Sequence, residues 1–141
     1  MKNISQAAFM IIKKMQQNEL NESIIYEEIA KFAKGEENKK TLLRLSSEER
    51  AHNEIWKKYS GIKMKPEKWK ILKYKFIARV FGFTFAVKLM ENGESGAQKE
   101  YALLESEVEE SVMIRKQEEE HEASLLGMLD EELLQYVGSM V

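Results

Sequence analysis

The chain has 141 residues and a formal net charge of −2, with 43% apolar and 33% charged residues. This size and apolar content fit one compact domain with a single core. The absence of cysteine excludes disulfides, thiolate zinc sites, iron–sulfur clusters and cysteine nucleophiles. The net acidity argues against nucleic-acid binding, because that needs a basic surface. Because the chain has no cysteine thiolate, any bound metal would have oxygen and nitrogen ligands.

The composition favours helices. All of the acidic residues except Asp130 are glutamates, and Pro66 is the single proline; glutamate tolerates helix interiors better than aspartate, and far better than proline. Residues 1–6 lack the apolar core of a signal peptide. The longest apolar-leaning run, 76–90, is shorter than the ~20 residues that a membrane span needs. We therefore expect an all-α, soluble, cytoplasmic protein.

Glycine and proline mark the limits of the predicted helices. Gly35 separates the first two helices, Gly61 and Pro66 lie in a crossover over 60–66, and Gly82 is a candidate bend. Asp130 has the features of an N-cap for a short tail helix. The pattern predicts helices over residues 5–34, 37–59, 67–104 and 107–126 and a tail helix over 131–140.

Four long helices with one longer crossover form two helical hairpins, the arrangement of a ferritin-like four-helix bundle. We assign residues 1–128 to this bundle and 129–141 to the tail. The two hairpins are also similar in sequence, because each contains Glu-x6-Tyr followed by Glu-x-x-His, and we interpret this as an internal duplication. The two sets are Glu19, Tyr26, Glu49 and His52, and Glu94, Tyr101, Glu118 and His121.

Glutamate interrupts the apolar seam of each of the four long predicted helices. Along the second helix the seam steps by 3 or 4 residues from Leu42 to Tyr59 and includes Glu49 and His52. The other three seams contain Glu19, Glu94, and Glu118 with His121. Four converging buried carboxylates would repel one another and take up protons unless cations neutralised them. Two divalent cations would balance the four charges.

The spacing and the residue types together predict a centre for two metal ions. Residues equidistant from the turn of a helical hairpin lie level, which brings each lone glutamate close to its partner motif. Glu and His at i and i+3 share a helix face, and carboxylates with one imidazole per metal suit iron or manganese. Glu22 also lies on the seam, as a ligand or, as we favour, a hydrogen-bond partner. We expect Glu48, Glu119 and Glu120 to face solvent.

On these motifs, residues 3–128 resemble the rubrerythrin and ferritin-like di-iron superfamily. The resemblance implies that Glu49 and Glu118 bridge two metal ions. It implies terminal ligation by Glu19, Glu94, His52 and His121, with Tyr26 and Tyr101 hydrogen-bonded to ligand carboxylates. Two departures are Ala97, where peroxide-reducing rubrerythrins carry a further glutamate, and the lack of cysteine for a rubredoxin domain. The superfamily also implies a homodimer.

A second resemblance concerns residues 81–91 and 129–141. Both segments are similar to the ferritin-like domain attached to vacuolar-iron-transporter family proteins, the second to its junction with the membrane part. This implies a membrane transporter domain as partner and a place at the cytosolic face of a membrane. The chain would be either an excised domain or a free-standing relative.

Lysines crowd the crossover and the start of the third helix, interleaved with Trp56, Tyr59, Trp69 and Tyr74. An anionic-lipid or partner surface is one interpretation. A solvated face that balances the acidic stretch 105–122 is the simpler one. The lysines are Lys57, Lys58, Lys63, Lys65, Lys68, Lys70, Lys73 and Lys75.

The leading functional hypothesis is a di-iron carboxylate oxidoreductase. It would bind two Fe(II) and oxidise them with O₂ or hydrogen peroxide, as a ferroxidase or peroxidase-like protein in iron homeostasis or oxidant defence. One alternative is a non-catalytic iron-capturing or sensing domain that serves a membrane iron transporter, and another is a purely structural helical protein. The sequence does not decide whether the metal is iron or manganese, or whether the oxidant is O₂ or hydrogen peroxide.

Overall fold

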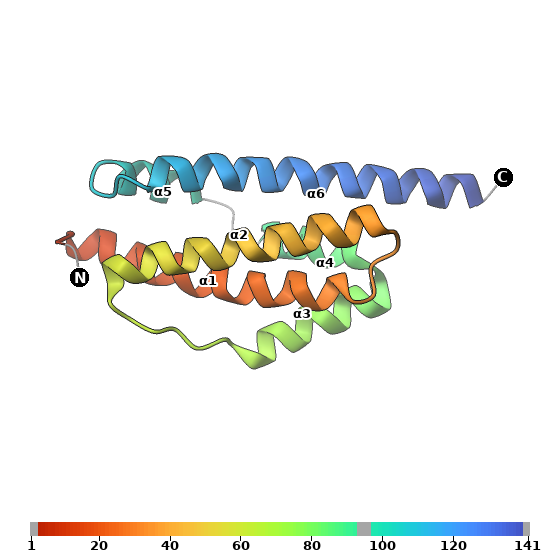
Figure 1. Cartoon of the computed structure of the whole chain (residues 1–141), viewed down its shortest axis with the longest axis horizontal. Helices are drawn as coiled ribbons and strands as arrows, with labels where there is room; N and C mark the ends of the chain where they lie inside the picture. Colours follow the sequence, from red (N-terminus) through yellow and green to blue (C-terminus); the bar gives the residue numbers. More distant parts are fainter. Residues whose placement is uncertain (1–2, 93–96, 140–141) are drawn as a thin grey trace.

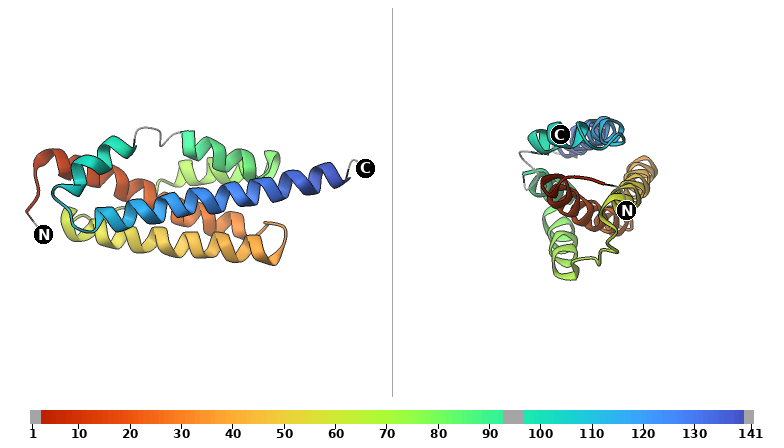
Figure 2. Two further views of the ribbon diagram at one scale, coloured as in Figure 1. Left: turned by 90° about the horizontal axis from the view of Figure 1, so that it is seen from above. Right: turned by 90° about the vertical axis from the view of Figure 1, so that its left-hand side faces the viewer.

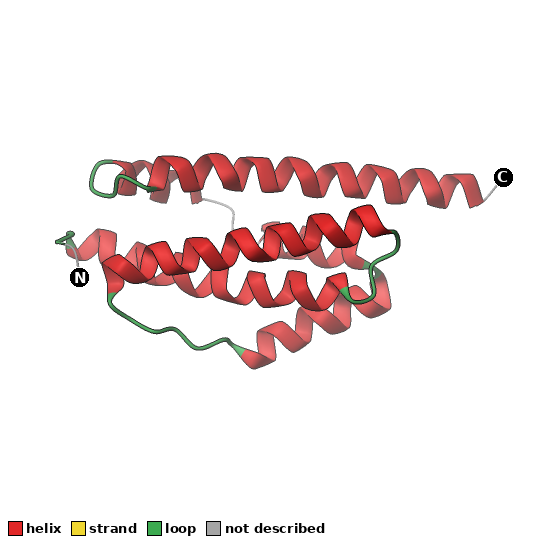
Figure 3. Cartoon of the chain, viewed as in Figure 1, coloured by secondary structure: helices red, strands yellow, loops and turns green. Residues whose placement is uncertain are grey.

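The computed structural model describes residues 3–92 and 97–139, and within these ranges it contains helices and no strand (Figures 1 and 3). The expected all-α class is therefore confirmed for the described part of the chain. The helices are α1 (Gln6–Ala30), α2 (Glu36–Ser60), α3 (Lys68–Phe81), α4 (Phe83–Asn92), α5 (Ala97–Glu105) and α6 (Ser111–Ser139).

The ends of the first two helices follow from local chemistry. Ser5 caps α1, because its hydroxyl accepts a hydrogen bond from the Ala8 N–H at 3.2 Å. The Glu107 carboxylate in turn accepts from the Ser5 N–H at 2.7 Å, which ties the start of α1 to the α5–α6 loop. The expected breaks at Gly35 and Gly61 are observed, with φ angles of 84° and 69° that side-chain-bearing residues rarely adopt.

The helices pack as a bundle around α1. Helices α1 and α2 form an antiparallel hairpin, α6 lies along α2, and α4 and α5 follow one another along a further side (Figures 1 and 2). Helix α3 lies on the opposite side of α1 from α6 (Figure 2).

Two apolar clusters fill the core, one toward each end of the bundle. The first cluster includes Ile25 and Ile29 of α1 and Leu45 of α2. The second includes Ile12 of α1 and Trp56 of α2. Because α1 and α2 are antiparallel, the stretch between the clusters on both helices lies at mid-length of the bundle, and this is where the seam becomes polar.

The single third helix expected over 67–104 is not observed. Gly82 adopts a φ of 94°, and α4 turns back alongside α3 instead of continuing it (Figure 1). This turn brings Phe83 and Ala86 of α4 into the same core cluster as Tyr74 and Ala78 of α3, which a straight helix could not do. Residues 93–96, between α4 and α5, lie outside the described residues.

The separate tail helix is also not observed, because α6 runs without a break from Ser111 to Ser139. A lone Gly127 costs a helix only about 1 kcal/mol, and continuing the helix pairs backbone groups that a break at Asp130 would leave free. Within residues 3–92 and 97–139, no helix combines the length and the apolarity that crossing a bilayer requires.

Candidate metal centre

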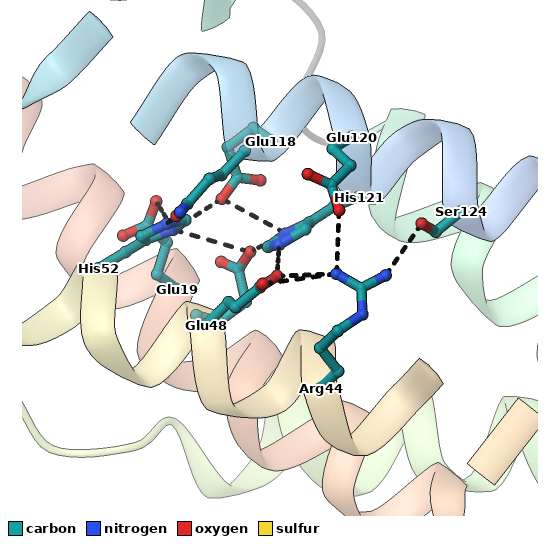
Figure 4. Close-up of polar contacts among 10 residues, drawn as sticks. Glu19, Arg44, Glu48, His52, Glu118, Glu120, His121 and Ser124 are labelled. Atoms are coloured by element: carbon teal, nitrogen blue, oxygen red, sulfur yellow. Dashed lines mark hydrogen bonds and ion pairs between the residues drawn. The ribbon is translucent and has the colours of Figure 1, made fainter. Parts of the chain in front are cut away.

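Four of the predicted ligands meet at mid-length of the bundle, between the two apolar clusters. Figure 4 shows three of them, Glu19, His52 and Glu118, close together. Each offers one oxygen or nitrogen atom, and these atoms all lie within 4.8 Å of one another. Helix α1 contributes one of them, α2 contributes two and α6 contributes the fourth. They are Glu19, Glu49, His52 and Glu118.

The two Glu-x-x-His motifs contact each other crosswise. His52 Nδ1 lies 3.0 Å from Glu118 Oε1, and His121 Nδ1 lies 2.6 Å from Glu49 Oε1. The two imidazole rings stack at 5.8 Å between centroids with 19° between their planes. Each histidine also lies near the glutamate of its own motif, at 3.9 Å for His52 Nδ1 to Glu49 Oε1 and 3.8 Å for His121 Nδ1 to Glu118 Oε1. The carboxylates of Glu49 and Glu118 therefore sit among both imidazoles.

The outer nitrogen of each imidazole has a partner that the sequence pattern did not indicate. His52 Nε2 lies 2.5 Å from Gln117 Oε1, and His121 Nε2 lies 2.5 Å from Glu48 Oε2. Arg44 donates to Glu48 at 3.2 Å, so this carboxylate links the buried histidine to a charged group at the surface. The expectation that Glu48 faces only solvent is therefore wrong.

Glu119 and Glu120 are mostly exposed, as expected. Glu120 accepts a hydrogen bond from Arg44 at 3.2 Å, and Arg44 also donates to Ser124 at 3.1 Å (Figure 4). An i, i+4 pairing of Arg44 with Glu48 is readable from sequence. The contact of Glu48 with His121 is not, because it depends on how α6 sits against α2.

Burial dominates the acid–base properties of two of the carboxyls. It raises the pKa of Glu19 to about 8, with the nearby His52 imidazole, whose Nδ1 lies 3.7 Å from Glu19 Oε1, acting against it. It also raises the pKa of Glu49 well above the usual value, and the nearby charges of Glu118 and Glu19 raise it further. Without a metal, Glu19 therefore keeps its proton near neutral pH, and Glu49 keeps its proton to a higher pH than an ordinary glutamate does.

The pKa values of Glu118 and His52 are shifted in the opposite sense, toward the charged form of each group. Burial opposes ionisation of Glu118, but its hydrogen bond with His52 and the proximity of Glu49 outweigh burial and lower its pKa. Burial alone would lower the pKa of His52, yet contacts with Glu118 and Glu19 raise it to about 10. Without a metal, the centre therefore retains extra protons, and the positively charged imidazolium of His52 partly neutralises the surrounding carboxylates.

The residues present fit a metal ion. Within the described part of the chain, Glu19 Oε2 and Glu49 Oε2 are buried and have no hydrogen-bond partner. This is an unfavourable state for carboxylate oxygens unless a proton or cation binds them. Oxygen donors with imidazole nitrogen suit hard or borderline divalent metals. The buried cluster could therefore hold a metal ion.

The other predicted site residues lie as follows. Glu94 lies outside the described residues. Tyr26 and Tyr101 are buried, each in one of the two apolar clusters, and their hydrogen bonds to ligand carboxylates stay a prediction. Glu22 is buried but is not one of the four clustered ligands; it lines a pocket of about 50 Å³ that also includes Lys70 of α3.

Comparisons with known proteins identify no family for this chain. The chain matches no protein-family model, no curated protein and no solved structure. The resemblance to the rubrerythrin and ferritin-like superfamily therefore stays a prediction. The case for a metal centre rests on the positions and burial of its glutamate and histidine side chains.

Proposed function

We propose that this protein is a ferritin-like di-iron carboxylate protein that binds two Fe(II) ions in its core and oxidises them with O₂ or hydrogen peroxide. One observation carries the proposal: two Glu-x-x-His motifs from different helices meet crosswise at a buried cluster with Glu19. A bundle with no ligand to bind would gain stability by placing apolar residues there, because buried carboxylates are costly.

The contacts support a division of roles among the ligands. Glu49 and Glu118 each lie near both imidazoles, so we assign them as the carboxylates shared by two ions. His52 and His121 would each hold one ion, and Glu19 would bind one ion from α1. Glu94 would supply the matching carboxylate in the second half of the chain. The crosswise contacts at 2.6 and 3.0 Å are the evidence for the shared pair.

Iron supplies the one-electron chemistry of this reaction. Oxidising two Fe(II) with O₂ and two protons gives two Fe(III) and hydrogen peroxide; with hydrogen peroxide and two protons it gives two Fe(III) and two water molecules. The protein contributes the ligands, the dry surroundings and the proton balance. Glu19 and His52, whose pKa values are raised to about 8 and about 10, must release their protons to bind metal, and these protons become available to the reduced oxygen.

The surroundings of the cluster favour a reaction inside the protein. The apolar clusters on both sides keep bulk water from Glu19, Glu49 and His52, which are buried, while Glu118 is partly exposed; the low water content strengthens electrostatic interactions around the buried groups. On the side of α2 that faces α6, Glu48 and Arg44 connect His121 to the surface.

The decisive experiment measures Fe(II) binding without oxygen and Fe(III) formation after O₂ or hydrogen peroxide is added. We expect two bound Fe(II) per chain and oxidation faster than in buffer. Glu49→Gln should lose both properties, whereas Glu54→Gln, at an exposed position of the same helix, should keep them. Binding without faster oxidation would favour the iron-capturing alternative, and no binding would refute the proposal.

A further inference from the structure

The outward face of α3 is apolar. Trp69, Leu72, Phe76 and Val80 follow one another at helical spacing, and each is more than half exposed; Trp69 is 83% exposed. The opposite face of the same helix packs inward through Tyr74 and Ala78, which are buried. Helix α3 therefore has two apolar faces, and its packing on α1 and α4 accounts for only one.

Cations flank this outward stripe. The sequence of α3, KWKILKYKFIARVF, carries five cationic residues and no acidic residue. With about 100° between successive residues, Lys70 and Lys73 fall on one side of the stripe. On the other side lie Lys68, Lys75 and Arg79. Among the described residues, Lys75 alone of the five forms an ion pair with a carboxylate, to Glu28 at 3.1 Å.

Two further aromatic side chains are exposed where α3 meets α4. Phe81, the last residue of α3, and Phe85 of α4 are both largely exposed, and their ring centroids lie 5.5 Å apart. No described helix covers the stripe, since α3 lies on the outside of the bundle, away from α6 (Figure 2). The face is thus free to contact a partner without disturbing the metal centre.

We propose that this face of α3 docks on a membrane surface that contains anionic lipid. An amphipathic helix with Trp, Phe and Leu on one face and Lys or Arg beside them lies in the interface plane, with the apolar side chains among the acyl chains and the cations at the headgroups. Tryptophan is suited to that depth because its ring is apolar and its N–H is polar. The inference does not depend on the proposed iron chemistry.

Charge complementarity selects lipid over a second copy of the chain. Two α3 helices meeting through this stripe would bring together two helices that each carry five cations and no acidic residue, and like charges at close range repel. An anionic bilayer instead attracts every one of these cations, at about fivefold in binding for each cation close to the surface. The acyl-chain region of the bilayer also buries the apolar stripe, which is exposed to water in the free protein.

Vesicle flotation tests the proposal on the whole chain. The probes are phosphatidylcholine vesicles with and without phosphatidylglycerol, at low and high salt. We expect the protein to float with the anionic vesicles, to float poorly with the neutral ones, and to be released by salt. Lys68→Gln with Lys73→Gln should weaken binding by more than about tenfold. Trp69→Ser with Phe76→Ser should do the same.

A matched control removes exposed apolar side chains elsewhere. Leu43→Ser with Met113→Ser, on α2 and α6, should bind the anionic vesicles as the parent does, because both residues are exposed and away from α3. Trp69 also reports directly, since the other tryptophan, Trp56, is fully buried. A blue shift of the fluorescence on vesicle binding should disappear in Trp69→Phe while binding persists.

Three results would overturn the proposal. The first is a parent protein that does not float with anionic vesicles. The second is an equal loss of binding in the control variant. The third is a dimer in sedimentation experiments that Trp69→Ser with Phe76→Ser dissociates, together with no vesicle binding, because the stripe would then be a contact between copies of the chain.

Discussion

His121 Nδ1 lies 2.6 Å from Glu49 Oε1, a contact between residues 72 positions apart in the chain. It joins the histidine of the second Glu-x-x-His motif to the glutamate of the first, while His52 and Glu118 make the reciprocal contact at 3.0 Å. The motifs therefore form one interlocked unit, and a change in either motif should alter the whole centre.

Metal removal should destabilise the protein. A ligand that binds only the folded state stabilises it by roughly 3 kcal/mol when present at about 100 times its Kd. For a chain of 141 residues, this is a shift of several degrees in Tm. We expect a chelator to lower Tm of the iron-loaded protein, as measured by circular dichroism. An identical Tm with and without chelator would contradict a metal centre in the core.

Glu49→Gln should separate stability from metal binding. It removes a carboxyl whose burial raises its pKa and leaves an amide of the same size, so Tm of the metal-free protein should not fall and should rise by a few degrees. The same variant should show no further rise with iron. Glu54→Gln is the matched control and should keep the parent's response to iron. A metal-free Glu49→Gln protein that unfolds at lower Tm would contradict this account of the carboxyl.

The stability of the metal-free protein should fall as pH rises from about 5 to about 8. Glu19 has a pKa of about 8 when folded and His52 about 10, against ordinary values of 4.5 and 6.5. Across this range the folded protein keeps protons that the unfolded chain has released, so raising pH favours unfolding. Glu118, whose pKa is lowered, acts the other way only at more acidic pH. Thermal melts with chelator present would check this, and Glu19→Gln should flatten the slope.

Glu48→Gln should weaken metal binding without abolishing it. Glu48 Oε2 contacts the outer nitrogen of His121 at 2.5 Å, and partners of ligand histidines are worth about 10- to 100-fold in metal affinity. Glu120→Gln is the control, because Glu120 shares the Arg44 contact but is mostly exposed. Isothermal titration with Fe(II) under nitrogen would measure both. Equal affinities for the two variants would mean that the Glu48 contact has no role.

Two glycine substitutions test the fold itself. Gly127 lies inside α6 with no atom near the position of an added Cβ, so Gly127→Ala should stabilise the protein by about 1 kcal/mol. Gly35 is equally open, but its φ of 84° strains any other residue, and Gly35→Ala should destabilise by roughly 1–2 kcal/mol. Urea unfolding would measure both. No stabilisation from Gly127→Ala would contradict a continuous α6.

The sequence could predict the helical class and the convergence of Glu19, Glu49, His52 and Glu118. These follow from periodicity, because spacing of 3 and 4 fixes which side chains share a helix face. Contacts that depend on how one helix is set against another could not be read in this way. Glu48 lies beside Glu49 but off the seam, and only the placement of α6 brings His121 to it.

The errors in the helix limits have a similar cause. The sequence predicts a bend at Gly82, and glycine permits the positive φ that is observed there, but nothing in the sequence indicates that the chain turns back on itself. That turn is favoured by the packing of Phe83 and Ala86, which is a tertiary effect. Asp130 has the local pattern of an N-cap, but the continuing backbone hydrogen bonds of α6 outweigh it.

The most direct test of the central claim is anomalous scattering at the iron edge from a crystal of the Fe(II)-loaded protein. We predict two iron peaks in the core, both within coordination distance of the Glu49 and Glu118 carboxylates, with His52 and His121 each bound to one of them. Iron found only at surface carboxylates, or no iron peak between these two residues, would contradict the account.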